Sequence, residues 1–227
     1  MLNDNRIRII IGHFGSGKTE FAMNYAMKLS EMTNDPIALA DLDIVNPYFR
    51  SRQKAKTLEA RGIEVISSAR GNKYDNADIP MVSAGVLKIF QTEGLNGIID
   101  VGGDAAGARP MVRYKAYLTK GNYDMFAVIN RYRQETSTVE GAIKHIKSIE
   151  AITNAKVTGL INNTHLLRET SVEDVMYGQV IVREVSKQLG IPIKYVCALE
   201  SIAGALKNET FNGEIFPIKL YMREDWM

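Results

Sequence analysis

The chain contains a single cysteine, Cys197, among its 227 residues. One thiol cannot form an internal disulfide, and its isolation excludes a Cys-x-x-Cys metal or redox site. Because Cys197 follows the apolar pair Tyr195-Val196, we interpret it as a small core residue rather than as a reactive thiol.

Long hydrophobic runs and a large charge excess are also missing. No stretch of about eighteen apolar residues occurs, so the sequence predicts no membrane span. Residues 1–6 lack the apolar region of a secretory signal, and we therefore expect a cytoplasmic protein. The formal net charge is only +2, which argues against a dedicated nucleic-acid-binding protein.

The composition is that of one globular domain, with 45% hydrophobic and 24% charged residues, and we predict a single domain over residues 1–227. Short β-rich runs alternate with helical stretches, which indicates parallel crossovers. The expected fold is an α/β doubly wound, mostly parallel sheet with helices on both faces, a three-layer sandwich whose ligand binds beyond the carboxyl ends of the strands. The predicted strands lie near residues 6–11, 37–41, 63–66, 97–101, 124–130, 156–162 and 192–197, and the predicted helices near 17–32, 51–61, 78–93, 108–119, 137–152 and 171–189.

Residues 12–19 have the pattern G-x-x-x-x-G-K-[ST] of a phosphate-binding loop (P-loop), placed between an apolar run and a helical stretch. Glycines let successive backbone N–H groups surround a phosphate at the positive end of a helix. Lys18 would neutralise the β- and γ-phosphates, and the Thr19 hydroxyl would bind Mg²⁺. The alternative is an ordinary glycine-rich turn. The residues predicted to contact a nucleotide here are Gly12, His13, Phe14, Gly15, Ser16, Gly17, Lys18, Thr19 and Glu20.

Two carboxylates, Asp41 and Asp43, follow the second predicted strand. Alternate residues of an extended chain point the same way, so one or both would face Mg²⁺ and the attacking water. The alternative is an acidic loop that leads into the turn at Asn46 and Pro47.

The fourth predicted strand ends in Asp100, and Gly102 and Gly103 follow it. An aspartate at the end of an apolar strand is the Walker B arrangement, in which the carboxylate holds Mg²⁺ directly or through water. Gly103 would offer its N–H to a γ-phosphate, and the glycine pair would let the loop change shape when that phosphate leaves. A turn without a function is the alternative.

These three segments, in this order, resemble the MinD, ParA and nitrogenase-iron-protein class of P-loop ATPases, the SIMIBI class with its CobQ/CobB/MinD/ParA nucleotide-binding domain. The similarity covers most of the chain. It implies that Asp43 positions the hydrolytic water and that residues 102–104 form the second switch. It also implies that an asparagine after a later strand reads adenine, with Asn163 favoured and Asn162 as the next candidate. A polar strand end is the alternative for either residue.

One position departs from that class. Many members carry a second lysine five residues before the P-loop lysine, and it reaches across a dimer to the partner's phosphates. Here His13 takes that position and Phe14 follows instead of glycine. Histidine is shorter and largely neutral near pH 7. His13 could donate a hydrogen bond to a phosphate or pack against a second subunit, so a nucleotide-dependent homodimer stays an open alternative.

Several arginines lie on loops that would surround the ligand. One interpretation is that they are solvated cations, and the other is that they contact a partner or an anionic substrate. Because the lone cysteine lies far from both switches, we expect no bridging iron–sulfur cluster. The segment of residues 218–227 is short and carries acids among its apolar groups, which argues against stable membrane anchoring. The arginines are Arg50, Arg52, Arg109, Arg131 and Arg133.

The sequence thus predicts a cytoplasmic switch that binds ATP and Mg²⁺, hydrolyses ATP slowly and signals to an unidentified protein partner. The predicted catalytic residues are Lys18, Asp43 and Asp100, and the predicted Mg²⁺ ligands are Thr19, Asp43 and Asp100. Two alternatives stay open. One is an ATP-dependent small-molecule ligase or kinase similar to dethiobiotin synthetase, with Arg50, Arg52 and Arg109 at its candidate substrate pocket. The other is a sensor without hydrolysis. The guanine-binding motif Asn-Lys-x-Asp is missing, but its absence does not decide between ATP and GTP as the bound nucleotide.

Overall fold

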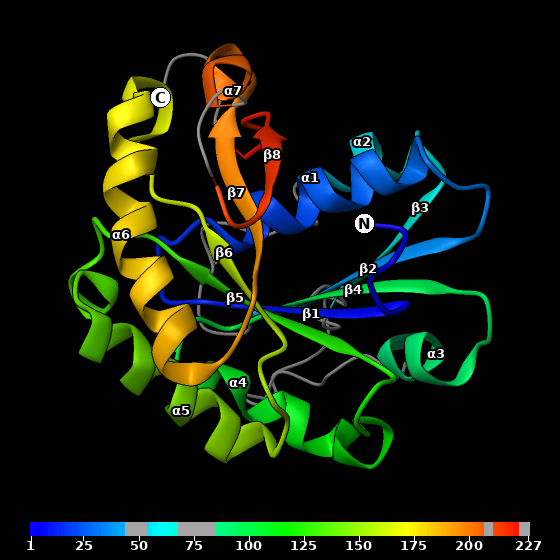
Figure 1. Cartoon of the computed structure of the whole chain (residues 1–227). Coiled ribbons are helices and arrows are strands. Elements are labelled where there is room, and N and C mark those ends of the chain that lie inside the picture. Colours follow the sequence, from blue (N-terminus) through cyan, green and yellow to red (C-terminus); the bar gives the residue numbers. More distant parts are fainter. Residues whose placement is uncertain (44–53, 68–84, 207–210, 223–227) are drawn as a thin grey trace, which may run out of the picture.

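The structure is a computed structural model that describes residues 1–43, 54–67, 85–206 and 211–222 (Figure 1). The strands of these residues form one sheet of eight in the order β3-β2-β4-β1-β5-β6-β7-β8, and every neighbouring pair is parallel. The predicted doubly wound parallel sheet is therefore confirmed. The strands are β1 (Ile7–Ile11), β2 (Ile37–Leu42), β3 (Ile63–Ser67), β4 (Asn96–Val101), β5 (Asp124–Ile129), β6 (Gly159–Asn162), β7 (Ile193–Leu199) and β8 (Glu214–Ile218).

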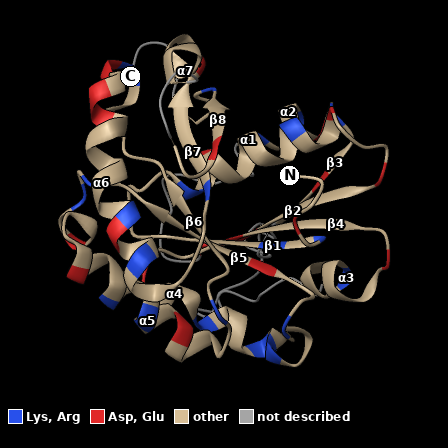
Figure 2. Ribbon diagram, viewed as in Figure 1, with Lys and Arg blue, Asp and Glu red and all other residues tan. Residues whose placement is uncertain are grey.

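Helices cover both faces of this sheet (Figure 1). Side chains alternate along a strand, so in β1 Ile9 and Ile11 pack in one core with α3 to α7, whereas Ile10 packs in the other with α1 and α2. Lys, Arg, Asp and Glu gather on the outer helices and loops, and the central strands are mostly free of them (Figure 2). The helices are α1 (Lys18–Ser30), α2 (Ala55–Glu59), α3 (Gly85–Gln91), α4 (Ala105–Ala108), α5 (Val139–Thr153), α6 (Val172–Leu189) and α7 (Glu200–Leu206), with 3₁₀ turns at Arg109–Tyr117, Gln134–Thr136 and Leu167–Glu169.

Three elements differ from the prediction. The helix expected at residues 108–119 is a short α4 followed by a 3₁₀ segment. Pro110 lacks the N–H that would continue the hydrogen bonding of α4, so α4 ends before it. The strand β8 and the helix α7 were not predicted from the sequence. Pro217 lies within β8, which is tolerated because β8 is an edge strand. The helices expected at 51–61 and 78–93 lie partly outside the described residues, which contain α2 and α3.

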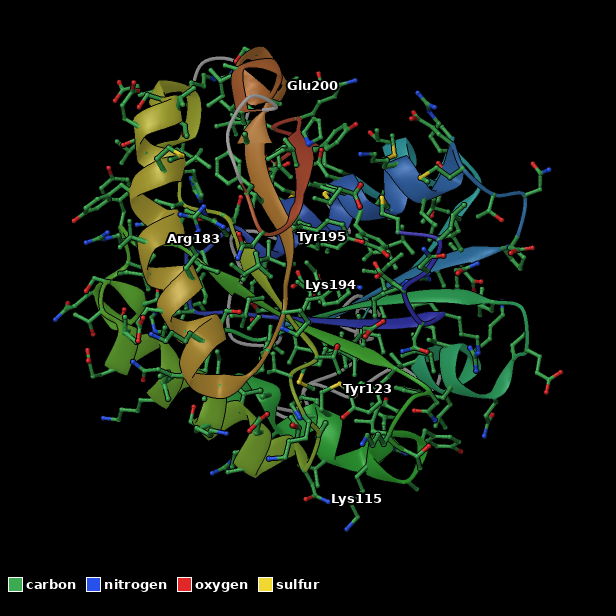
Figure 3. The ribbon with its side chains drawn as sticks, viewed as in Figure 1. Lys115, Tyr123, Arg183, Lys194, Tyr195 and Glu200 are labelled. Carbon is green, nitrogen blue, oxygen red and sulfur yellow. The ribbon has the colours of Figure 1, made fainter. Side chains whose placement is uncertain are left out.

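Buried Asp4 holds the amino-terminal segment against the sheet, at the edge opposite the P-loop. Its carboxylate accepts a 2.7 Å hydrogen bond from Tyr25 and a further one from Tyr195, and it lies 2.8 Å from the Lys194 ammonium. Lys194 and Tyr195 both come from β7 (Figure 3). Within the described residues, no helix combines the length and the apolarity that crossing a bilayer requires.

Candidate nucleotide site

The P-loop links the end of β1 to the start of α1 at the carboxyl edge of the sheet. Gly15 and Gly17 have φ angles of +72° and +85°, a left-handed conformation that favours glycine. A Cβ atom on Gly17 would lie 2.2 Å from Nδ2 of Asn163, closer than any packing allows. Glycine at these positions is therefore a requirement of the loop's path.

The carbonyl groups of this loop are bonded on its outer side. The Gly15 oxygen accepts a 2.8 Å hydrogen bond from Nε of Arg133 and a 3.5 Å one from Nδ2 of Asn130. The Ser16 oxygen accepts a 2.7 Å hydrogen bond from Nδ2 of Asn163. The first N–H groups of α1 have no partner within the helix. With its carbonyls held outward, the loop offers these amides to an anion at the positive end of the helix.

Thr19 joins the P-loop to the Walker B strand. Its Oγ1 donates a 2.6 Å hydrogen bond to Oδ2 of Asp100, which ends β4 and is 1% exposed. Oδ1 of Asp100 is buried without a hydrogen-bond partner among the described residues. Burial, together with the negative charges of Asp41 and Asp43, raises the pKa of Asp100 to about 7 against the opposing influence of Lys18 and Thr19. The orphaned oxygen is a place for a hard cation.

The donor set fits Mg²⁺ held mainly by phosphate and water. No cluster of three or more His, Cys, Asp or Glu side chains with metal-binding geometry occurs in the described part of the chain. Mg²⁺ usually takes one or two protein ligands and keeps several waters. Thr19 and Asp100 supply that number.

Lys18 faces Asp43, the first residue after β2. Its Nζ lies 3.8 Å from Oδ2 of Asp43, and both side chains are almost fully buried. The Asp43 N–H donates to Oδ1 of Asp41 at 3.0 Å, and Asp41 lies opposite Asp100 in the register of β2 and β4. The structure thus brings together the P-loop lysine and the three aspartates that the sequence singled out.

Phe14 packs against the loop predicted to be the second switch. A Cβ atom on Gly103 would lie 2.8 Å from the Phe14 nitrogen, and Lys18 Nζ is 5.5 Å from the centre of the Phe14 ring. Asp104 caps α4, since its Oδ1 accepts a 2.6 Å hydrogen bond from the Gly107 N–H. A movement of the P-loop at Phe14 would therefore displace the loop that contains Gly103.

His13 is engaged within its own chain. Its Nδ1 lies 3.2 Å from Oε2 of Glu135, and its ring meets the His145 ring edge-to-face at 5.6 Å between centroids. Burial, with the positive charges of His13 and Lys18, lowers the pKa of His145 to about 4. His145 was not singled out in the sequence, because a lone histidine on a helix carries no pattern.

A cavity of about 230 Å³ lies beside the P-loop, between the loop after β6, the end of β7 and the segment after β8. The exposed area of its lining is mostly apolar, with polar side chains from α1, from Arg133 and from the loop after β6, which suits a flat ring. Asp43 and Asp100 lie outside it. The lining residues are Gly15, Gly17, Lys18, Thr19, Glu20, Arg133, Asn163, Thr164, His165, Leu167, Thr170, Cys197, Ala198, Leu199, Ile218, Leu220 and Met222.

The two candidate base-reading asparagines have different environments. Asn163 lines the cavity, and its amide nitrogen is bonded to the P-loop. Asn162 is fully buried and points into α6, where its Nδ2 donates to the Val175 oxygen and to Oε1 of Gln179, both at 2.9 Å. Its oxygen accepts the Thr164 N–H at 3.1 Å. This geometry does not fit the base contact predicted for Asn162, because its side chain is used to dock α6.

The loop arginines for which the structure gives contacts are bonded within the chain. Arg133 holds the P-loop, and Arg131 lies 3.3 Å from the centre of the Tyr177 ring and donates to the Tyr177 oxygen at 2.6 Å. Arg109 is exposed in the 3₁₀ segment after α4. Arg50 and Arg52 lie outside the described residues, as does the turn at residues 46–47.

No protein-family model matches the sequence, and neither does any curated protein. Solved structures are similar to it. Cell division protein FtsY from Thermotoga maritima is 19% identical over 85% of this chain and 61% of that chain, with a TM-score of 0.51. FtsY from Mycoplasma mycoides is 17% identical over 85% and 60%, with a TM-score of 0.53. Chloroplast FtsY from Physcomitrella patens is 16% identical over 85% and 58%, with a TM-score of 0.54.

The chain shares with these FtsY structures an α/β fold built on a parallel sheet. The fold that the resemblance drawn from the sequence implied is therefore confirmed. The likeness concerns the fold alone, because the identities are low and the chain covers less than two thirds of each of these FtsY proteins.

Proposed function

We propose that this chain is a Mg²⁺-dependent nucleoside triphosphatase, with ATP as its nucleotide, that hydrolyses slowly and acts as a switch on a protein partner. The observation that supports this most strongly is the 2.6 Å hydrogen bond between Thr19 Oγ1 and Asp100 Oδ2. It joins the two motifs between which P-loop enzymes hold Mg²⁺. We further propose that residues 1–227 act as one cytoplasmic nucleotide-binding domain.

The phosphate side of the site follows from the residues around Lys18. Lys18 and the P-loop amides hold the charge of the β- and γ-phosphates, and Asp43 orients the attacking water. Mg²⁺, when bound by Thr19 and Asp100, supplies further charge neutralisation. Lys18 lies 3.8 Å from Asp43, so an arriving phosphate competes with a carboxylate for the same ammonium. Catalysis by this set depends on positioning and electrostatic stabilisation.

The base side of the site is the cavity beside the P-loop. Its apolar surface, from the end of β7 and the segment after β8, would stack on the base, and Asn163 lines the same cavity. We assign the base contact to Asn163 and not to Asn162. The carboxamide of Asn163 also bonds Ser16, so base and phosphate binding share one side chain.

The switch function rests on the contact between Phe14 and Gly103. Loss of the γ-phosphate would release the loop after β4, and the surface that it forms with α4 would change shape for a partner. A nucleotide-dependent homodimer is one form of such a partner. The contact of His13 with Glu135 favours a role for His13 at its own P-loop over a reach across a dimer.

Phosphate release from purified protein with Mg²⁺ tests the proposal. Slow release with ATP and no other substrate supports the switch, and a higher rate with GTP would correct the choice of nucleotide. Release only after a small-molecule acceptor is added would instead indicate a ligase or kinase. Binding of nucleotide without release would indicate a sensor.

The variant Lys18→Ala tests the assignment of the phosphate site. It removes the ammonium that faces the phosphates, and we expect nucleotide affinity to fall by about 10- to 100-fold, the worth of a charge-assisted hydrogen bond. If calorimetry detects no heat for ATP or GTP with the parent protein, or if Lys18→Ala binds as well as the parent, the proposal is wrong.

A further inference from the structure

The segment after β8 is fastened to the first two turns of α1. The Glu20 carboxylate accepts hydrogen bonds from the backbone N–H groups of Tyr221 and Met222, the latter at 3.1 Å from Oε2. One turn further along, Asn24 pairs with both backbone groups of Lys219: its Nδ2 donates to the Lys219 oxygen and its Oδ1 accepts the Lys219 N–H, each at 2.8 Å. We call residues 218–222 the C-terminal wall.

The C-terminal wall forms one side of the cavity that the proposed function assigns to the base. Its alternate residues Ile218, Leu220 and Met222 line this cavity, as expected for an extended chain that presents one face. Glu20 lines it too, two residues beyond Lys18. The same helix that begins at the phosphates therefore holds the surface beside the base.

The charge of Glu20 makes this arrangement informative. A carboxylate in the first turn of α1 repels a nearby triphosphate. Any direct electrostatic effect of Glu20 on phosphate affinity is therefore unfavourable. Its bonds to Tyr221 and Met222 give the carboxylate a different purpose. Because these bonds already hold the wall in place, little conformational entropy is lost when the base binds, and the affinity for the base is higher.

We propose that Glu20 and Asn24 are positioning residues that hold the C-terminal wall against the base and so determine affinity for the base, while the P-loop determines affinity for the phosphates. This inference rests on the proposed function. It assigns the specificity of the site to a segment 200 residues distant in the sequence, because the Tyr221 N–H bonds Glu20 across 201 positions.

Calorimetry with two ligands separates the two contributions: MgATP, and magnesium tripolyphosphate, which has phosphates and no base. Glu20→Ala and Asn24→Ala should each weaken MgATP binding by at least about fivefold, as expected for lost hydrogen bonds to a binding surface. Tripolyphosphate affinity should stay within about twofold for Asn24→Ala and stay or rise for Glu20→Ala. Ser30→Ala is the matched control, because Ser30 lies on the same helix and its hydroxyl donates to the Met27 oxygen, one turn back on that helix.

Equal loss of both ligands in Asn24→Ala, or unchanged MgATP affinity in both variants, overturns the inference while leaving the proposed function intact. If the parent protein binds neither MgATP nor magnesium tripolyphosphate, the proposed function is overturned instead. Amide hydrogen exchange on the parent protein gives an independent readout if a variant does not fold. MgATP should slow exchange at Tyr221 and Met222 and tripolyphosphate should not; equal protection by both ligands contradicts the inference.

Discussion

Thr19 Oγ1 lies 2.6 Å from Asp100 Oδ2, although 81 positions separate the two residues. The hydrogen bond occupies one carboxylate oxygen and leaves Oδ1 of Asp100 buried without a partner in the described structure. A buried carboxylate in this state is costly to ionise unless a cation reaches it. The pair therefore couples cation binding, the protonation of Asp100 and the stability of the fold.

The first prediction concerns the pH dependence that Asp100 imposes in the absence of Mg²⁺. Burial raises its pKa from 3.8 to about 7, so the folded protein binds this proton more tightly than the unfolded chain. The stabilisation is complete below pH 4 and is lost as the pH rises to 7. Asp100→Asn, which mimics the protonated acid, should equal the parent in stability near pH 4 and exceed it at pH 8, by at most about 4 kcal/mol.

Urea denaturation at both pH values measures this difference. Addition of MgATP at pH 8 should reverse the order, because a cation then stabilises the parent carboxylate and not the amide. A parent and variant whose stabilities differ by the same amount at pH 4 and pH 8 would show that Asp100 does not titrate in this range.

The second prediction concerns His145, whose titration acts in the opposite direction. Its pKa falls from 6.5 to about 4 because of burial and the charges of His13 and Lys18, partly offset by Asp104 and Glu135. The folded state keeps the ring neutral, so its contribution is complete above pH 6.5 and is lost as the pH falls to 4. His145→Leu should remove this acid sensitivity, with a gain relative to the parent of at most about 3 kcal/mol at pH 4.

The two effects overlap between pH 4 and pH 7, so the stability curve of the parent alone cannot separate them. The useful quantity is the difference in unfolding free energy between parent and His145→Leu at pH 4.5 and at pH 7.5. We expect that difference to shift in favour of the variant on acidification; a constant difference would rule out a buried neutral imidazole. Asp100→Asn, measured in parallel, supplies the opposite slope as a control.

The third prediction separates the two adjacent asparagines. Asn162→Ala removes bonds to Val175 and Gln179 and leaves buried groups unsatisfied, so it should lower stability by about 1–3 kcal/mol with little change in nucleotide affinity. Asn163→Ala frees the Ser16 carbonyl and removes a cavity side chain. It should weaken nucleotide binding by about tenfold. Calorimetry and thermal unfolding on both variants test the contrast, and loss of affinity in Asn162→Ala alone would reverse our assignment.

The order of strands and helices was largely predictable because it depends on local patterns. Apolar runs such as residues 125–129 show a strand buried on both faces, and the strand–turn–helix at the P-loop is a local signal. What the sequence hid depends on context. Pro217 masks β8, whose edge position makes the proline harmless, and Pro110 stops α4 from continuing where one longer helix was expected.

The candidate site divides in the same way. The P-loop and the aspartates at the carboxyl ends of β2 and β4 were found because glycine, lysine and carboxylates carry chemistry at fixed spacing. The side-chain roles of Glu20, Asn162 and Arg133 were not found, because each contact joins segments far apart in the chain. Which of two neighbouring asparagines faces the cavity depends on the register of one strand, and only the packing of α6 on β6 fixes it.

The last prediction concerns Arg133, which holds the Gly15 carbonyl outward through its Nε at 2.8 Å. Arg133→Lys keeps the charge but loses the fixed Nε donor, so it tests geometry without changing electrostatics. With the carbonyl released, the P-loop must be ordered by the ligand, and affinity for MgATP and for magnesium tripolyphosphate should fall together by about fivefold. Lys187→Arg, on the solvent side of α6, is the matched control and should bind as the parent does. If Arg133→Lys weakens MgATP alone, Arg133 contacts the base or ribose instead, and its bond to Gly15 has no part in shaping the phosphate site.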